Sequence, residues 1–198
     1  MKQISLSGSL RENVGRQGAT ELRRSGRVPG VLYGGSNQIH FSVSEMDLIK
    51  LLRQPETFQI NLEIDGKSYA TVMQEKQQHP VTDRVTHIDL LELVPGKEVK
   101  TALPVRVTGS SEGVKAGGKL VQNYRKMRII GLPDALPEAI TVDITPLKIG
   151  DMIRVREISI PGCRFAEADA SAVVAVQATR ASIAADNAGA DDGKKKKK

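Results

Sequence analysis

Short runs in which apolar and polar residues alternate dominate the first half of the chain. Alternation with a period of two is typical of strands that bury one face. It is clearest from Phe58 to Ile64, and the Asp65-Gly66 pair that follows is a strong signal for a tight β-hairpin turn. The pattern predicts strands over residues 4–10, 31–33, 39–43, 58–64, 67–74 and 85–93.

Two short helices are predicted between these strands. Residues 18–25 contain helix formers without alternation, and Gly26 after them is a stop signal. The second helix is predicted to follow Ser44, a suitable N-cap, with apolar residues at helical spacing, namely Met46, Ile49 and Leu52. Helices mixed with strands in this way indicate an α+β N-terminal domain.

The chain changes character after the turn at Val94-Pro95-Gly96, beyond which we see no helical pattern. Strands are predicted around residues 103–107, 120–124, 127–130, 140–144, 153–160 and 172–176. Short strands separated by Gly and Pro turns favour a β-sandwich or barrel. The glycine-rich stretch at 109–118 lacks the Lys-Ser or Lys-Thr ending of a phosphate-binding loop, so we interpret it as a mobile hairpin tip.

Three segments result from these patterns. We predict a first domain over residues 1–94 and a mainly β C-terminal domain over 95–180. Residues 181–198 are Ala, Asp and Gly followed by five lysines, a composition with too few apolar residues to fold, so we predict a disordered tail. The lysines would either attract RNA through charge or only keep the chain soluble.

Composition narrows the class of protein. The single cysteine, Cys163, cannot form an intramolecular disulfide, and the N-terminus has no continuous apolar core of a signal peptide, so we expect a reducing, cytosolic environment. No stretch approaches the roughly 18 consecutive apolar residues of a membrane span. Net charge is +6, and residues 1–38 hold six basic against two acidic side chains. This basic segment favours a polyanionic partner.

Candidate catalytic residues are few. His79, His87 and Asp89 could bind a metal, but His79 precedes a proline in a predicted turn, and no further His or Cys completes a site. Cys163 lies in a Pro-Gly-Cys turn, and no serine has the context of a nucleophile elbow. We therefore expect no metal, no cofactor and no enzymatic activity, with a His- or metal-dependent hydrolase kept as an alternative.

The same residues suit an RNA-binding surface. Strand parity places Ile88 and Leu90 on one face of the strand at 85–93 and His87 with Asp89 on the other. Arginines present donor forks to phosphates and base edges. Aromatic residues are only 3% of the chain, which favours recognition of duplex RNA over base stacking. The alternative is that the arginines form an ordinary solvated face.

Several motifs resemble one known family, the bacterial large-subunit ribosomal proteins that bind 5S rRNA, which include the general stress protein Ctc. In the first domain the resemblance rests on Arg11, on LRRSGRVPGVLYG at 22–34 and on His87-Ile88-Asp89. In the second it rests on LPV at 103–105, GVKAGG at 113–118 and DITPLKIGD at 143–151, which are similar to the longer, two-domain branch. The resemblance covers residues 4–178.

The resemblance implies that the first domain is a small β-barrel with short helices, which docks on the irregular duplex called loop E of 5S rRNA. The RNA-contacting positions that it implies are Arg11, Arg16, Arg23, Arg24, Tyr33, Gln74, His87 and Asp89. This chain departs from the family at Thr20, Glu21 and Gln78, where relatives often carry basic residues, so we expect a lower affinity than that of the more basic relatives.

The function expected from the sequence is that of a structural protein of the large ribosomal subunit in the cytoplasm. Its expected partners are 5S rRNA and, through the second domain, neighbouring ribosomal proteins, and we expect a monomer away from the ribosome. A stress-linked protein-interaction module is the alternative, in which the second domain is the functional part.

Overall fold

The computed structural model describes residues 2–35, 37–54 and 56–180, so the predicted tail lies outside the described residues. The chain divides into two compact units. Of the described residues, the first unit comprises those up to 104 together with 128–139 and 161–164, and the second comprises 105–127, 140–160 and 165–180. Residues 95–104, which we assigned to the second domain, belong to the first unit in this division.

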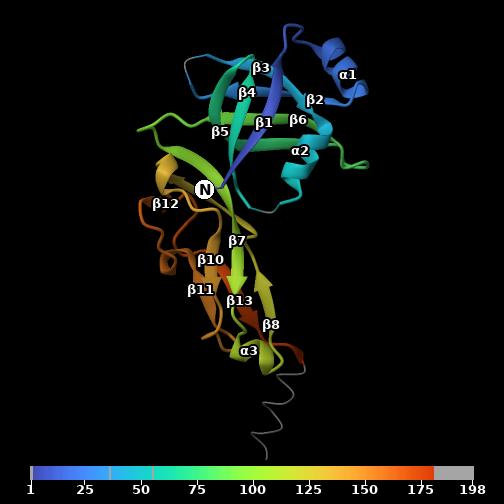
Figure 1. Cartoon of the computed structure of the whole chain (residues 1–198). Helices are drawn as coiled ribbons and strands as arrows, with labels where there is room; N and C mark the ends of the chain where they lie inside the picture. Colours follow the sequence, from blue (N-terminus) through green and yellow to red (C-terminus); the bar gives the residue numbers. More distant parts are fainter. Residues whose placement is uncertain (1, 36, 55, 181–198) are drawn as a thin grey trace, which may run out of the picture. The chain divides into compact units, whose positions relative to one another are not determined.

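The first unit is built around a closed β-barrel, as the resemblance implied (Figure 1). Its strands follow the order β1-β3-β2-β6-β5-β4 around the barrel. Two pairs, β1 with β4 and β2 with β6, are parallel, and the other four pairs are antiparallel. The elements are β1 (Gln3–Leu10), α1 (Arg16–Arg24), β2 (Arg27–Tyr33), β3 (Ile39–Ser44), α2 (Glu45–Leu52), β4 (Gln59–Ile64), β5 (Lys67–Gln78) and β6 (Val85–Glu92).

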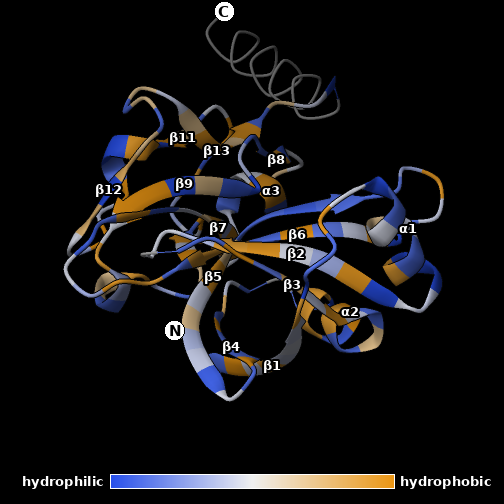
Figure 2. Ribbon diagram, turned by 90° about the horizontal axis from the view of Figure 1, so that it is seen from above, coloured by the Kyte–Doolittle hydropathy of each residue, from blue (hydrophilic) through white to orange (hydrophobic). Residues whose placement is uncertain are grey.

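Alternation along the strands fills the barrel with apolar side chains, and Figure 2 shows hydrophobic and hydrophilic stretches following one another along β2. Leu32, Phe41, Leu62 and Leu90 are fully buried in one hydrophobic cluster. The hairpin between β4 and β5 turns at Asp65-Gly66, where both residues have positive φ, 48° and 79°. This is the backbone of a type I′ turn, and the predicted hairpin is confirmed.

Two strand boundaries in the first unit differ from the predictions, and the burial along α2 adds a detail that the sequence did not give. β2 begins at Arg27, four positions earlier than predicted, because Val28 to Gly30 pair with β3 despite the proline between them. β5 continues to Gln78, past the predicted end, through a register shift after Met73. In α2 the residues buried against the barrel are Leu48 and Leu51, whereas Met46 is 69% exposed.

The C-terminal half is mainly β, as predicted, and contributes two further sheets (Figure 1). Their strand orders are β10-β7-β9-β12 and β11-β13-β8. The elements are β7 (Val99–Thr108), α3 (Glu112–Lys115), β8 (Lys119–Gln122), β9 (Lys126–Gly131), η1 (Pro133–Ala135), β10 (Ile140–Asp143), β11 (Met152–Arg154), η2 (Val155–Glu157), β12 (Cys163–Phe165) and β13 (Ala172–Gln177).

Three predictions for this half were wrong. The stretch at 109–118 contains the helix α3, whose N-cap Ser111 is buried and bonds the Leu147 carbonyl at 2.6 Å. The stretch predicted as one strand at 153–160 is β strand only to Arg154, after which a 3₁₀ turn follows. Cys163, which we placed in a turn, begins β12.

Candidate nucleic-acid interface

The outer side of the β5–β6 pair carries polar side chains from both strands. On β6, Ile88 and Leu90 point into the barrel and are fully buried, so His87 and Asp89 face outward, as parity predicted. Across the strand pair, Gln77 lies opposite His87 and Glu75 lies opposite Asp89. Directly opposed residues share a face of the sheet. These side chains therefore form one polar row.

His87 and Asp89 are in direct contact. His87 Nδ1 lies 2.6 Å from Asp89 Oδ1, and the two side chains are 24% and 30% exposed. The alignment does not meet hydrogen-bond geometry, and Nδ1 is buried without another partner among the described residues. Because Nδ1 faces Asp89, Nε2 is the ring nitrogen left for a ligand.

Tyr33 joins this row from the neighbouring strand β2. β2 runs parallel to β6, with Val31 opposite Asp89 and Tyr33 two positions further along. Burial raises the pKa of the Tyr33 phenol, and the negative charges of Asp89 and Glu75 raise it further. The phenol therefore stays protonated at neutral pH and can donate a hydrogen bond. We call the surface formed by Tyr33, Glu75, Gln77, His87 and Asp89 the outer face.

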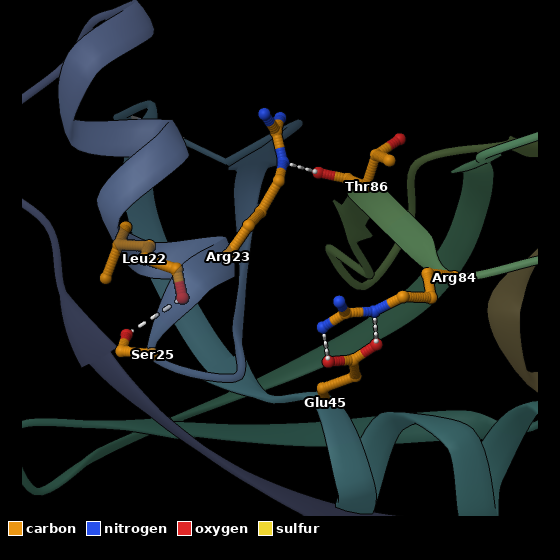
Figure 3. Close-up of polar contacts among 6 residues, drawn as sticks. All are labelled: Leu22, Arg23, Ser25, Glu45, Arg84 and Thr86. Carbon is orange, nitrogen blue, oxygen red and sulfur yellow. Dashed lines mark hydrogen bonds and ion pairs between the residues drawn. The ribbon is translucent and has the colours of Figure 1, made fainter. Parts of the chain in front are cut away.

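Arg23 lies beside the outer face. It is near the end of α1, and its Nε donates to the Thr86 carbonyl at 3.0 Å (Figure 3). Thr86 immediately precedes His87 on β6, so this bond anchors the side chain close to the outer face. The terminal nitrogens of Arg23 point away from Thr86 (Figure 3). The guanidinium thus keeps donors for a ligand while its position is fixed by the strand.

The other predicted site residues are not joined to the outer face by any described hydrogen bond or ion pair. Arg11 donates to the carbonyls of Asn13 and Gly15, at 2.9 and 3.0 Å, and so shapes the loop before α1. Arg16 and Arg24 are exposed at the two ends of α1. Gln74 is exposed at the register shift in β5.

Gln77 and Glu75 were missed by the sequence analysis. Parity along a single strand cannot find them, because two register shifts lie between β5 and β6, after Met73 and after Gln77. The available signal was the hairpin itself, since the strands on either side of a turn pair with each other. The departures from the family pattern are all exposed, and Gln78 is engaged locally through a 3.4 Å bond to the Asp83 carbonyl.

The candidate metal and nucleophile residues have other roles. His79 Nδ1 accepts hydrogen bonds from the backbone N–H groups of Val81 and Thr82, both at 3.3 Å, and closes the β5–β6 turn. Burial raises the pKa of the Cys163 thiol, which disfavours the reactive thiolate. The residues described in the structure contain no group of three His, Cys, Asp or Glu side chains that could hold a metal ion.

Among the described residues, no helix is long and apolar enough to cross a membrane.

Comparison with known proteins places both halves of the chain. Residues 6–90 match the Ribosomal L25p family, and residues 98–180 match the family described as Ribosomal protein TL5, C-terminal domain. Proteins named large ribosomal subunit protein bL25 are similar over almost the whole chain. The protein of Porphyromonas gingivalis is 39% identical over 183 residues, which are 91% of this chain and 95% of its own length. The protein of Amoebophilus asiaticus is 36% identical over 198 residues, the full length of both chains.

The β-barrel, the second mainly β half and these relatives together place the chain in the class of structural ribosomal proteins, which are not enzymes. Both family matches fall in the same order along the chain as in the two-domain form that the sequence motifs resembled. The chain belongs to the Ribosomal L25p family.

Proposed function

We propose that the chain is a structural component of the large ribosomal subunit and binds the loop E duplex of 5S rRNA through its first domain, residues 1–94. The relatives named as large ribosomal subunit proteins support the first part of this proposal. The outer face, with Arg23 beside it, supports the second. In this proposal the domain at 95–180 contacts neighbouring components of the ribosome.

The observation that carries the proposal is the placement of His87 between an orienting carboxylate and a cross-strand amide. Asp89 holds one side of the imidazole at 2.6 Å, and Gln77 lies opposite on β5. Imidazole and amide groups can donate to and accept from base edges and ribose hydroxyls in a shallow RNA groove. The carboxylate suits RNA because it can accept from exocyclic amines while it lies against one side of the His87 ring.

Charge supports duplex RNA as the ligand. Arg11, Arg16, Arg23 and Arg24 lie on α1 or in the loop before it, next to the barrel. Their charges would neutralise phosphates and give a salt-dependent affinity, while the outer face would supply selectivity. Tyr33 and His87 are the two rings of the outer face, and the face has no phenylalanine or tryptophan, which is too few for a stacking platform.

Titration of the full chain with 5S rRNA and with an unrelated duplex of equal length, each at two salt concentrations, tests the proposal. We expect selective binding to 5S rRNA that His87→Ala and Gln77→Ala both weaken. The matched control is Ser68→Ala, an exposed position on the same strand as Gln77 but near its other end. Each lost polar contact should reduce selectivity by about 1–3 kcal/mol if it reads a base edge.

Equal binding to both RNAs, with a steep salt dependence and no effect of His87→Ala, would contradict the proposal. The arginines would then be only a generic basic surface. In that case the alternative of a protein-interaction module, tested by pull-down from nuclease-treated extract, becomes the better explanation of the two-domain form.

A further inference from the structure

A groove in the first unit lies next to the outer face and is lined by several cationic side chains. Its volume is about 250 Å³. The end of α1, the start of β2, the first residue of α2 and the turn between β5 and β6 contribute Arg23, Arg27, Glu45, His79 and Arg84. We propose that this groove binds a backbone phosphate of the RNA docked on the outer face. This inference rests on the proposed function and extends the RNA contact to residues outside it.

The arginines of the groove are held in place by the protein itself. Arg27 donates to Ser42 Oγ, to the Ser42 carbonyl and to Ser9 Oγ, at 3.1, 2.8 and 2.7 Å. Arg84 Nε and Nη2 donate to the two carboxylate oxygens of Glu45, at 2.9 and 2.6 Å (Figure 3). In both guanidiniums Nη1 remains for a ligand. Because these side chains are already ordered, a phosphate binds them with a smaller loss of conformational entropy.

His79 adds a donor to this set. Its Nδ1 accepts from the backbone N–H groups of Val81 and Thr82, so this nitrogen is unprotonated. Nε2 is then the ring nitrogen that carries a proton and donates. The turn is closed by two backbone bonds, from His79 N to the Arg84 carbonyl at 2.8 Å and from Asp83 N to the His79 carbonyl at 2.9 Å. The donor therefore sits on an ordered turn.

The balance of charge in the groove favours an anion. Glu45 is the one carboxylate among the described residues that line it, and its charge is neutralised by Arg84. Arg23 and Arg27 add two further positive charges. Val28 and Val85, which are 1% and 5% exposed, line the groove without adding polar groups. Donors outnumber acceptors, as a phosphate requires.

The position of the groove indicates which anion it takes. Arg23 lines the groove and is bonded to Thr86, the residue that precedes His87 on β6. A nucleic-acid strand that contacts His87 can therefore place a neighbouring phosphate in the groove without leaving the surface. The outer face and the groove lie close enough for one RNA strand to contact both, so we assign the groove to a backbone phosphate of the bound RNA and not to a free anion.

Charge variants on the two sides of the Arg84–Glu45 pair test this inference in the full chain. Arg84→Gln removes a cation, and we expect it to weaken binding to 5S rRNA roughly 2- to 5-fold, the range of an exposed ion contact. It should also lower the slope of log affinity against log salt by about 1. Glu45→Gln keeps an accepting oxygen for Arg84 but removes the negative charge, so we expect tighter binding by a similar factor.

The matched control is Lys67→Gln, an exposed cation at the start of β5. β5 has 12 residues, which places Lys67 roughly 35 Å along the strand from the turn that carries Arg84. Thermal unfolding without RNA checks that each variant is folded. If Arg84→Gln does not fold, the binding of Glu45→Gln is sufficient to test the inference. Selective 5S binding that neither groove variant changes relative to Lys67→Gln would overturn the inference and leave the proposed function intact. If the unaltered chain binds 5S rRNA no better than the unrelated duplex, both the inference and the proposed function are overturned.

Discussion

Replacing Arg23 with lysine keeps the positive charge at the end of α1 but removes the geometry of the guanidinium. In the structure Nε donates to the Thr86 carbonyl at 3.0 Å, and the terminal nitrogens point away from the strand (Figure 3). The single ammonium of lysine cannot donate to the Thr86 carbonyl and also offer a pair of parallel donors to RNA. The variant therefore separates the contribution of charge from that of shape.

Two losses of different size are expected for Arg23→Lys. Losing the bond to Thr86 should lower the free energy of unfolding by about 0.5–1.5 kcal/mol. Losing a bidentate contact with RNA should weaken binding to 5S rRNA by about 1–3 kcal/mol, or roughly 5- to 150-fold in Kd. Because the charge is kept, the salt dependence of binding should stay close to that of the unaltered chain.

Binding is measured by titration of 5S rRNA at two salt concentrations, and stability by urea unfolding of the free protein. The control is Arg24→Lys, since Arg24 is adjacent and exposed, and no described hydrogen bond or ion pair involves it. If Arg23→Lys binds 5S rRNA as tightly as Arg24→Lys and the unaltered chain, guanidinium geometry is not needed and the reasoning is refuted.

Two other predictions concern the fold. Gly30→Ala would place a methyl group 2.6 Å from Phe41 Cζ inside the barrel, so we expect a loss of about 1–3 kcal/mol in urea unfolding, and an unchanged midpoint would show that the barrel relaxes. The hydrogen bonds from Arg84 hold the pKa of the Glu45 carboxyl below its ordinary value. Their stabilisation should be present at neutral pH and lost as pH falls through that lowered pKa, so the stability difference between the unaltered chain and Glu45→Gln should disappear in acid. A difference independent of pH would contradict the assignment.

Local patterns were enough to predict most strands of the barrel. The alternation from Phe58 to Ile64 and the Asp65-Gly66 turn act between neighbours in sequence, and both appear in the structure as predicted. The parallel pairs β1–β4 and β2–β6 join segments that lie far apart in sequence. No local pattern encodes such pairs, so the closed barrel was predicted only through the resemblance to a family and not from the strand patterns.

The misplaced elements share a physical cause. The helix α3 has only four residues, too short for a periodic pattern, and depends on the buried hydroxyl of Ser111, which bonds a carbonyl 36 positions away. The apolar residues that the sequence marked on α2 are buried unequally, because Leu52 packs partly buried against the core while Met46 is exposed, and the buried residues of the helix are Leu48 and Leu51. Tertiary packing decides both outcomes, and a helix of eight residues contains too few turns to reveal its buried side.

The basic N-terminal segment shows why net charge is an incomplete guide to an RNA interface. Some of its arginines donate hydrogen bonds within the protein, and we call these the anchored arginines: Arg11, Arg23 and Arg27. No described hydrogen bond or ion pair involves Arg16 or Arg24. All five carry the same charge and contribute alike to the salt dependence of binding. Only the anchored arginines have their guanidinium planes set in advance, so they lose less entropy when RNA binds. Selectivity should therefore depend on the anchored set, and Arg→Lys changes distinguish the two sets where salt titration cannot.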